Sequence, residues 1–112
     1  MKIAIVGSRS ISSINFNDYI SERPECIISG GAKGIDQLAE AYAASMDIPV
    51  FVLKPDYNTF GRIATFKRNE QIIKECDKVF AFWDGRSKGT MHSIKMARKH
   101  NKPVELVVIN SD

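Results

Sequence analysis

The chain has 112 residues, enough for one compact domain over residues 1–112 and too few for two. Its 44% hydrophobic and 26% charged residues exclude a wholly disordered protein. The net charge of +3 is too small for a protein that coats DNA, but it suits a local positive site for an anionic ligand.

Apolar runs typical of strands alternate with helix-like runs along the chain, which predicts an α/β protein. In the first half of the chain, the pattern predicts a strand over 2–6, a short helix over about 14–22, a strand over 25–28, a helix over 33–46 and a strand over 49–53. In the second half it predicts a helix over about 60–75, a strand over 78–83, a helix over about 89–100 and a strand over 103–109. The helix over 33–46 is the clearest, because its apolar residues recur at i, i+3, i+4 and i+7.

The predicted strands are continuously apolar, which favours parallel pairing with both faces of the sheet covered. Right-handed crossovers then give a three-layer, doubly wound, Rossmann-like domain of about five parallel strands. We expect the strand order 3-2-1-4-5, although a flavodoxin-like order stays open. In both arrangements a ligand binds at the carboxyl ends of the strands, beside the first strand.

Segments rich in Gly, Ser and charge follow three of these strands and should meet at one edge of the sheet. They are Gly7-Ser8-Arg9, residues 29–36 and residues 84–90. Glycines allow close backbone approach, while helix N-termini, hydroxyls and arginine all bind phosphate. One glycine turn can be an ordinary tight turn, but three converging loops favour a phosphate-bearing ligand.

The motifs also exclude some classes of protein. GGAKG lacks GxGxxG spacing and the chain has no GxxxxGK[ST], which disfavours a conventional NAD dehydrogenase and a Walker-type NTPase. Cys26 and Cys76 stand in no metal-binding spacing, so we expect buried reduced thiols and no required metal or other cofactor. With no leader or membrane-length apolar run, a cytoplasmic protein is expected.

Several single residues have both a structural and a functional interpretation. Asn69 falls on an apolar stripe with Phe66 and Ile73, so its amide needs a partner, either in a neighbouring loop or, with Arg68, in the ligand. Asp36 is either a helix-dipole carboxylate, a contact to a ligand hydroxyl or a general base.

Three further side chains lie near the expected edge of the sheet. Trp83 either packs in the core or stacks on a base. His92 is either a solvated helix residue or a group that reaches the site, and Tyr57 follows the third strand at a position that could cover the pocket.

Four ordered motifs, GSR, SGGAKGID, FGR…KRN and FWDGRSKGT, resemble the small YspA-type proteins of the SLOG superfamily. That superfamily is similar in fold to DprA and to the Lonely Guy phosphoribohydrolases. The resemblance implies a Rossmann-like sheet and a nucleotide-derived ligand. The ligand-binding residues it implies are Gly7, Ser8, Arg9, Ser29, Gly30, Gly31, Gly34, Asp36, Arg68, Asn69, Asp84, Gly85, Ser87, Gly89 and Thr90.

The chain departs from the Lonely Guy enzymes at one turn. Those enzymes carry PGGxGT followed by a catalytic glutamate, whereas here DGRSKGT is followed by Met91, His92 and Ser93. Asp36 and Asp84 are the remaining candidates for a catalytic role.

Three functions are compatible with these residues. The first is a module that senses or sequesters a nucleotide or ADP-ribose-like ligand, and the second is a hydrolase of the N-glycosidic bond of a nucleoside phosphate. The third is a DNA-associated protein like DprA, using the basic residues Lys88, Lys95, Arg98, Lys99 and Lys102. Because such a charge run is usually a solvated face, nucleic acid is the less favoured partner. No membrane partner is expected, and the faces of so small a sheet allow a homodimer.

Overall fold

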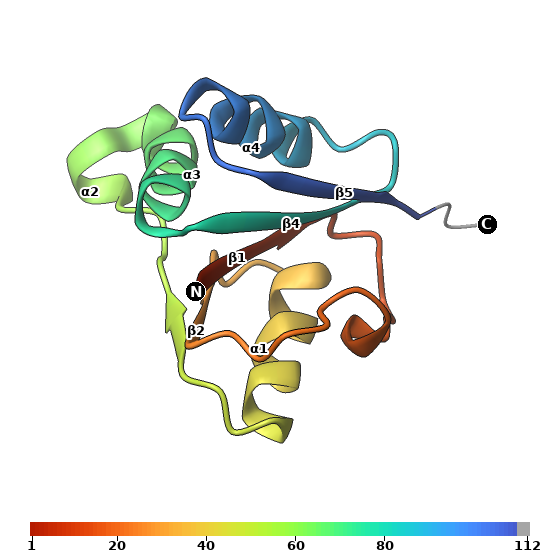
Figure 1. Ribbon diagram of the computed structural model, residues 1–112. Coiled ribbons are helices and arrows are strands. Elements are labelled where there is room, and N and C mark those ends of the chain that lie inside the picture. Colours follow the sequence, from red (N-terminus) through yellow and green to blue (C-terminus); the bar gives the residue numbers. More distant parts are fainter. Residues whose placement is uncertain (110–112) are drawn as a thin grey trace.

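The computed structural model describes residues 1–109, whose five strands form one parallel sheet in the order β3-β2-β1-β4-β5 (Figure 1). The predicted order is confirmed over the flavodoxin-like one. The strands are β1 Lys2–Gly7, β2 Cys26–Ser29, β3 Val50–Val52, β4 Lys78–Trp83 and β5 Val104–Val108. Since all pairs are parallel, the carboxyl ends of the strands lie along one edge.

Helices cover both faces of the sheet, which confirms the predicted three layers. Helix α1 (Ile35–Ser45) packs on one face, while α3 (Ala64–Glu75) and α4 (Lys88–Lys99) pack on the other (Figure 1). Strand β1 shows how the sequence specifies this, because Ile3 and Ile5 belong to the α1 core and Ala4 and Val6 to the opposite one. The central strand is therefore anchored on both faces, and its carboxyl end is held in place.

Two predicted helices are wrong in extent. The segment 14–22 contains only a 3₁₀ turn, η1 (Phe16–Asp18), because the side chain of Asn15 accepts the Asn17 N–H and competes with a longer helix. The helix expected over 60–75 is interrupted at Gly61, whose φ of +55° is incompatible with an α-helix. The chain forms α2 (Tyr57–Phe60), then η2 (Gly61–Ile63) and then α3.

The coverage of the sheet is incomplete at its edge. Phe51 on β3 is 56% exposed, so the helices cover this short edge strand less completely than they cover the central strands. Both cysteines are buried free thiols, as predicted. Among residues 1–109, no helix combines the length and the apolar character that a membrane span requires.

Candidate functional site

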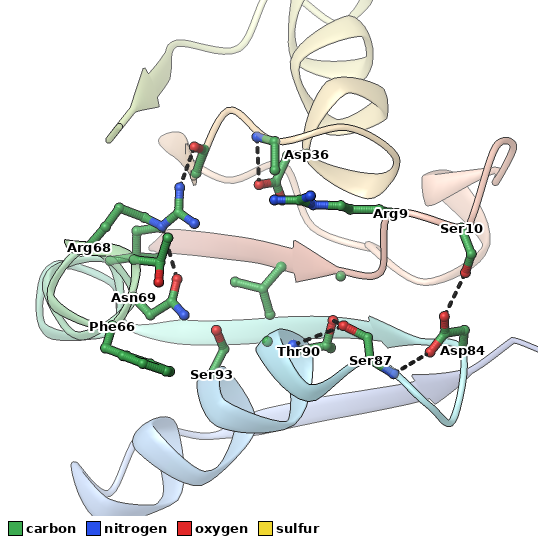
Figure 2. A pocket seen from close by; sticks show the side chains of 17 residues that line it. Arg9, Ser10, Asp36, Phe66, Arg68, Asn69, Asp84, Ser87, Thr90 and Ser93 are labelled. Carbon is green, nitrogen blue, oxygen red and sulfur yellow. Dashed lines mark hydrogen bonds between the residues drawn. The ribbon is translucent and has the colours of Figure 1, made fainter. Parts of the chain in front are cut away.

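A cavity of about 460 Å³ opens at the carboxyl ends of β1, β2 and β4 (Figure 2). Its walls come from the loops after these strands and from α3 and α4, so the three predicted segments do converge. The predicted residues that line it are Gly7, Arg9, Gly30, Asp36, Arg68, Asn69, Asp84, Ser87, Gly89 and Thr90.

Two of the predicted serines lie beneath the cavity and support its walls. Ser8 is fully buried, and its Oγ accepts the Asp84 N–H at 3.0 Å and lies 3.3 Å from Thr90 Oγ1. Ser29 is equally buried and donates to the Asp36 carbonyl at 3.4 Å. The Ser8 hydroxyl therefore joins the loop after β1 to the turn after β4, whereas the Ser29 hydroxyl joins the end of β2 to the start of α1 within one segment.

Three predicted glycines also lie outside the cavity lining. Gly34 has a φ of +76°, and a Cβ there would stand 2.5 Å from the Ser8 carbonyl oxygen, so only glycine lets α1 begin this close to the end of β1. Gly31 borders a separate small hollow, and Gly85 lies in the exposed turn before α4.

Asp84 organises the turn between β4 and α4. Its carboxylate accepts hydrogen bonds from Ser10 Oγ at 2.7 Å and from the backbone N–H groups of Arg86 and Ser87 at 2.8 Å each. These bonds, the Ser10 hydroxyl first, hold the pKa of Asp84 far below its usual range. A carboxylate so firmly ionised suits an anchor for the turn better than a group that transfers protons.

The first turn of α4 presents open donors to the cavity. Ser87 caps the helix, its Oγ accepting the Thr90 N–H at 3.3 Å, as drawn in Figure 2. Among residues 1–109, the N–H groups of Lys88 and Gly89 meet no acceptor. A Cβ on Gly89 would find nothing within 4 Å, so this end of the helix is open to a ligand. Free N–H groups and the positive end of the helix dipole favour an anion here.

Arg68 connects α3 to the loop that follows β2 (Figure 2). Its Nη1 donates to the Gly30 carbonyl at 2.6 Å and its Nε to Asn69 Oδ1 at 2.9 Å. A Cβ on Gly30 would lie 2.8 Å from Arg68 Nη1, so the missing side chain makes room for the guanidinium. Burial lowers the pKa of Arg68, but an arginine stays protonated at neutral pH.

Asp36 supplies a buried carboxylate close to the Arg68 guanidinium. Only 7% of the residue is exposed, and this burial raises its pKa to about 6. The Ala32 N–H, which donates to Oδ2 at 3.0 Å, and the charges of Arg68 and Arg9 act in the opposite direction. Figure 2 shows the Arg9 side chain extending alongside Asp36. The cavity therefore holds one carboxylate that titrates near neutral pH between two arginines.

An aromatic ring forms part of the wall that α3 contributes. Phe66 was expected on the buried stripe, but it is 48% exposed and lines the cavity, so that prediction is wrong. Its ring contacts the imidazole of His92 edge-on, with centroids 4.6 Å apart. The physical reason is that α3 presents Ala64, Ile72 and Ile73 to the core.

Sequence reasoning missed Ser10, Thr65 and Ser93, all of which line the cavity. Helical spacing could have found two of them, because Ser93 follows Thr90 by three positions and Thr65 precedes Asn69 by four. Trp83, His92 and Tyr57 do not line the cavity. Instead, the Trp83 indole donates to the Ser87 carbonyl at 3.0 Å, outside the lining.

The sequence matches the family model described as DNA recombination-mediator protein A over residues 1–59. The chain belongs to this family. It is also similar to the Gene 61 protein of Mycobacterium phage D29, with 33% identity over 84 residues that cover 70% of this chain and 67% of the phage protein. The match to the family model includes the loops after β1 and β2 but not α3 or α4, so this member's pocket is completed by a segment outside the matched region.

The arrangement can bind an anion next to an apolar, aromatic surface. Two arginines and the start of α4 supply positive charge and donors, and Phe66 supplies an aromatic ring. Within the part of the chain that the structure describes, no three His, Cys, Asp or Glu residues gather as a metal site would require.

Proposed function

We propose that this protein binds a nucleotide or a nucleotide-derived phosphorylated ligand, ADP-ribose-like compounds included, and acts as a sensing or sequestering module of the YspA type. The observation that carries the proposal is the convergence of Arg9, Arg68 and the open first turn of α4 on one cavity of about 460 Å³. Positive charge and free N–H groups on one concave surface are what phosphate recognition requires.

Each part of such a ligand would have a partner in the walls of the cavity. A phosphate fits at the N–H groups of Lys88 and Gly89, with the Arg9 and Arg68 charges nearby. The buried Asp36 carboxylate suits a ribose hydroxyl, which can donate to it. We place the base against Phe66, whose half-exposed ring could stack on it.

Hydrolysis of an N-glycosidic bond is the alternative activity of the same site. Asp36 is the better candidate for it, since a carboxyl with a pKa of about 6 can exchange a proton near neutral pH. The three hydrogen bonds that Asp84 accepts make it the weaker candidate.

DNA association is the second candidate function, and the family to which the chain belongs favours it. Lys88, Lys95, Arg98 and Lys99 are exposed on α4 and could contact phosphates. Lys102 is less suited to this role, because its Nζ donates to the Cys76 carbonyl at 2.7 Å. Affinity for single-stranded DNA that falls steeply with salt concentration would support this function, and a flat response would exclude it.

The decisive experiment identifies small molecules released from the purified protein by mass spectrometry and adds them back in a thermal-shift assay. A ligand at about a hundred times its Kd adds ~2.7 kcal/mol of stability, a shift that is easily measured. An intact phosphorylated nucleoside that stabilises the protein supports the binding module. Recovery of free base and sugar phosphate supports the hydrolase, and no stabilisation by any nucleotide overturns the proposed function.

A further inference from the structure

The amide of Asn69 has only one orientation that satisfies its neighbours. Arg68 Nε carries a proton and can only donate, so the Asn69 atom 2.9 Å away from it must be the oxygen. The Asn69 nitrogen then lies 3.3 Å from Nδ1 of His92. An amide nitrogen donates only, and therefore His92 Nδ1 must be the acceptor and carry no proton.

We infer that His92 is a positioning residue, whose unprotonated Nδ1 fixes the amide of Asn69 and thereby orients Arg68 in the cavity. The inference rests on the proposed function, because it concerns the arginine that would face the ligand's charge. The hydrogen bonds run from His92 through Asn69 and Arg68 to the Gly30 carbonyl. They join α4, α3 and the loop after β2, three separate walls of the same cavity.

Packing holds the imidazole in the orientation that the hydrogen bond to Asn69 requires. The edge-on contact with Phe66, at 4.6 Å between centroids, restricts the ring of His92 from the α3 side. His92 is half-buried and is not part of the cavity lining, so it acts on the site through two neighbours that do line it, Asn69 by a hydrogen bond and Phe66 by the ring contact. This placement explains why a histidine that does not reach the ligand still matters for the geometry of Arg68.

Protonation of His92 at Nδ1 removes the hydrogen bond between Asn69 and His92. A proton on Nδ1 would face the Asn69 NH₂ group, and flipping the amide would only turn that NH₂ group toward Arg68 Nε. Burial lowers the pKa of His92, whereas the carboxylate of Glu70 on α3 raises it. On α4 itself, Lys88 and Lys95 stand one turn away on either side. Strands β1 and β4 present apolar residues to this layer, among them Val6 and Ala81. As the pH falls and His92 becomes protonated, Arg68 Nε should therefore be held less firmly, while the Gly30 carbonyl still holds Nη1.

The test compares His92→Asn with His92→Leu. An asparagine Oδ1 can take the place of the imidazole Nδ1 as acceptor but does not titrate, whereas leucine removes the acceptor. The NMR signal of the Arg68 Nε–H is followed in the unliganded protein between about pH 7.5 and about pH 5. We expect it to move more in the wild type than in His92→Asn, and to be displaced at every pH in His92→Leu. Asp36 titrates in the same range in both proteins, so the difference between them isolates His92.

Affinity for adenosine 5′-monophosphate, measured by calorimetry on the same three proteins, provides the second readout. At about pH 7.5 we expect His92→Leu to bind about tenfold more weakly and His92→Asn to bind within about twofold of the wild type. At low pH the wild type should lose more affinity than His92→Asn. An Arg68 Nε–H signal that is the same in His92→Leu as in the wild type overturns the inference. If the wild type does not bind this probe, adenosine 5′-monophosphate is excluded as the ligand, while the signal in the unliganded protein still decides the role of His92.

Discussion

Arg68 Nη1 lies 2.6 Å from the carbonyl oxygen of Gly30, and this contact joins the middle of α3 to the turn that follows β2. It is a direct bond between two walls of the cavity. The guanidinium is positioned by this carbonyl and by Asn69, which leaves part of its donor fork for a ligand. The first two predictions concern this contact.

Gly30→Ala should weaken ligand binding about tenfold and leave the fold intact. The added Cβ would lie 2.8 Å from Arg68 Nη1, and the flexible side chain of Arg68 can move away. Calorimetry with the ligand identified by mass spectrometry measures the loss. The controls are Arg68→Ala and the double variant that carries Gly30→Ala and Arg68→Ala. If both changes act through the same arginine, the double variant should lose less binding free energy than the sum of the two single losses. Fully additive losses would contradict this explanation.

Arg68→Lys should also lose about tenfold in affinity although it keeps the positive charge. Lysine has no planar fork, so it cannot donate to the Gly30 carbonyl and to Asn69 from two fixed nitrogens. Arg62→Lys is the matched control, since Arg62 is exposed and does not line the cavity. Equal affinities for the two variants would show that charge alone is what Arg68 contributes.

Gly89→Ala should stabilise the protein and weaken its ligand complex. Alanine is the better helix former, by about 0.5–1 kcal/mol, and its Cβ meets no protein atom within 4 Å. The same methyl group enters the space in which we place the phosphate. Thermal unfolding without ligand and calorimetry with ligand measure the two effects separately. Affinity equal to the wild type would place the ligand elsewhere in the cavity.

Asp36→Asn should change how stability depends on pH. The folded-state pKa of about 6 lies above the ordinary 3.8, so the folded protein holds this proton more tightly than the unfolded chain does. As the pH rises from about 4 to about 6, the wild type should therefore lose about 2–3 kcal/mol of unfolding free energy relative to the variant. Urea unfolding at several pH values measures this difference. A difference that stays constant between about pH 4 and about pH 7 would contradict the raised pKa.

The sheet could be predicted because its signals are local. Apolar runs such as residues 2–6 and 78–83 mark buried parallel strands, and glycine-rich turns mark their carboxyl ends. The break at Gly61 was missed because the flanking residues continue a helical pattern, and only the backbone shows the positive φ.

The cavity could be predicted only in part. Loops that follow neighbouring strands must meet, so Arg9, Gly30 and Ser87 could be placed together from the topology. The orientation of α3 depends on which side chains reach the core, and that packing turned Phe66 toward the cavity. Ser8 and Ser29 are of a residue type that often binds ligands, but both are fully buried and support the loops instead.

The position of β1 between β2 and β4 has a consequence for how the protein opens. Strand β2 belongs to the first half of the chain and β4 to the second half. Residues from both halves line the cavity. Separation of β1 from β4 would pull Arg9 away from Ser87 and dismantle the cavity in one step. A bound ligand would thus bridge the two halves of the sheet and slow amide hydrogen exchange in the central strands, far from the atoms it touches.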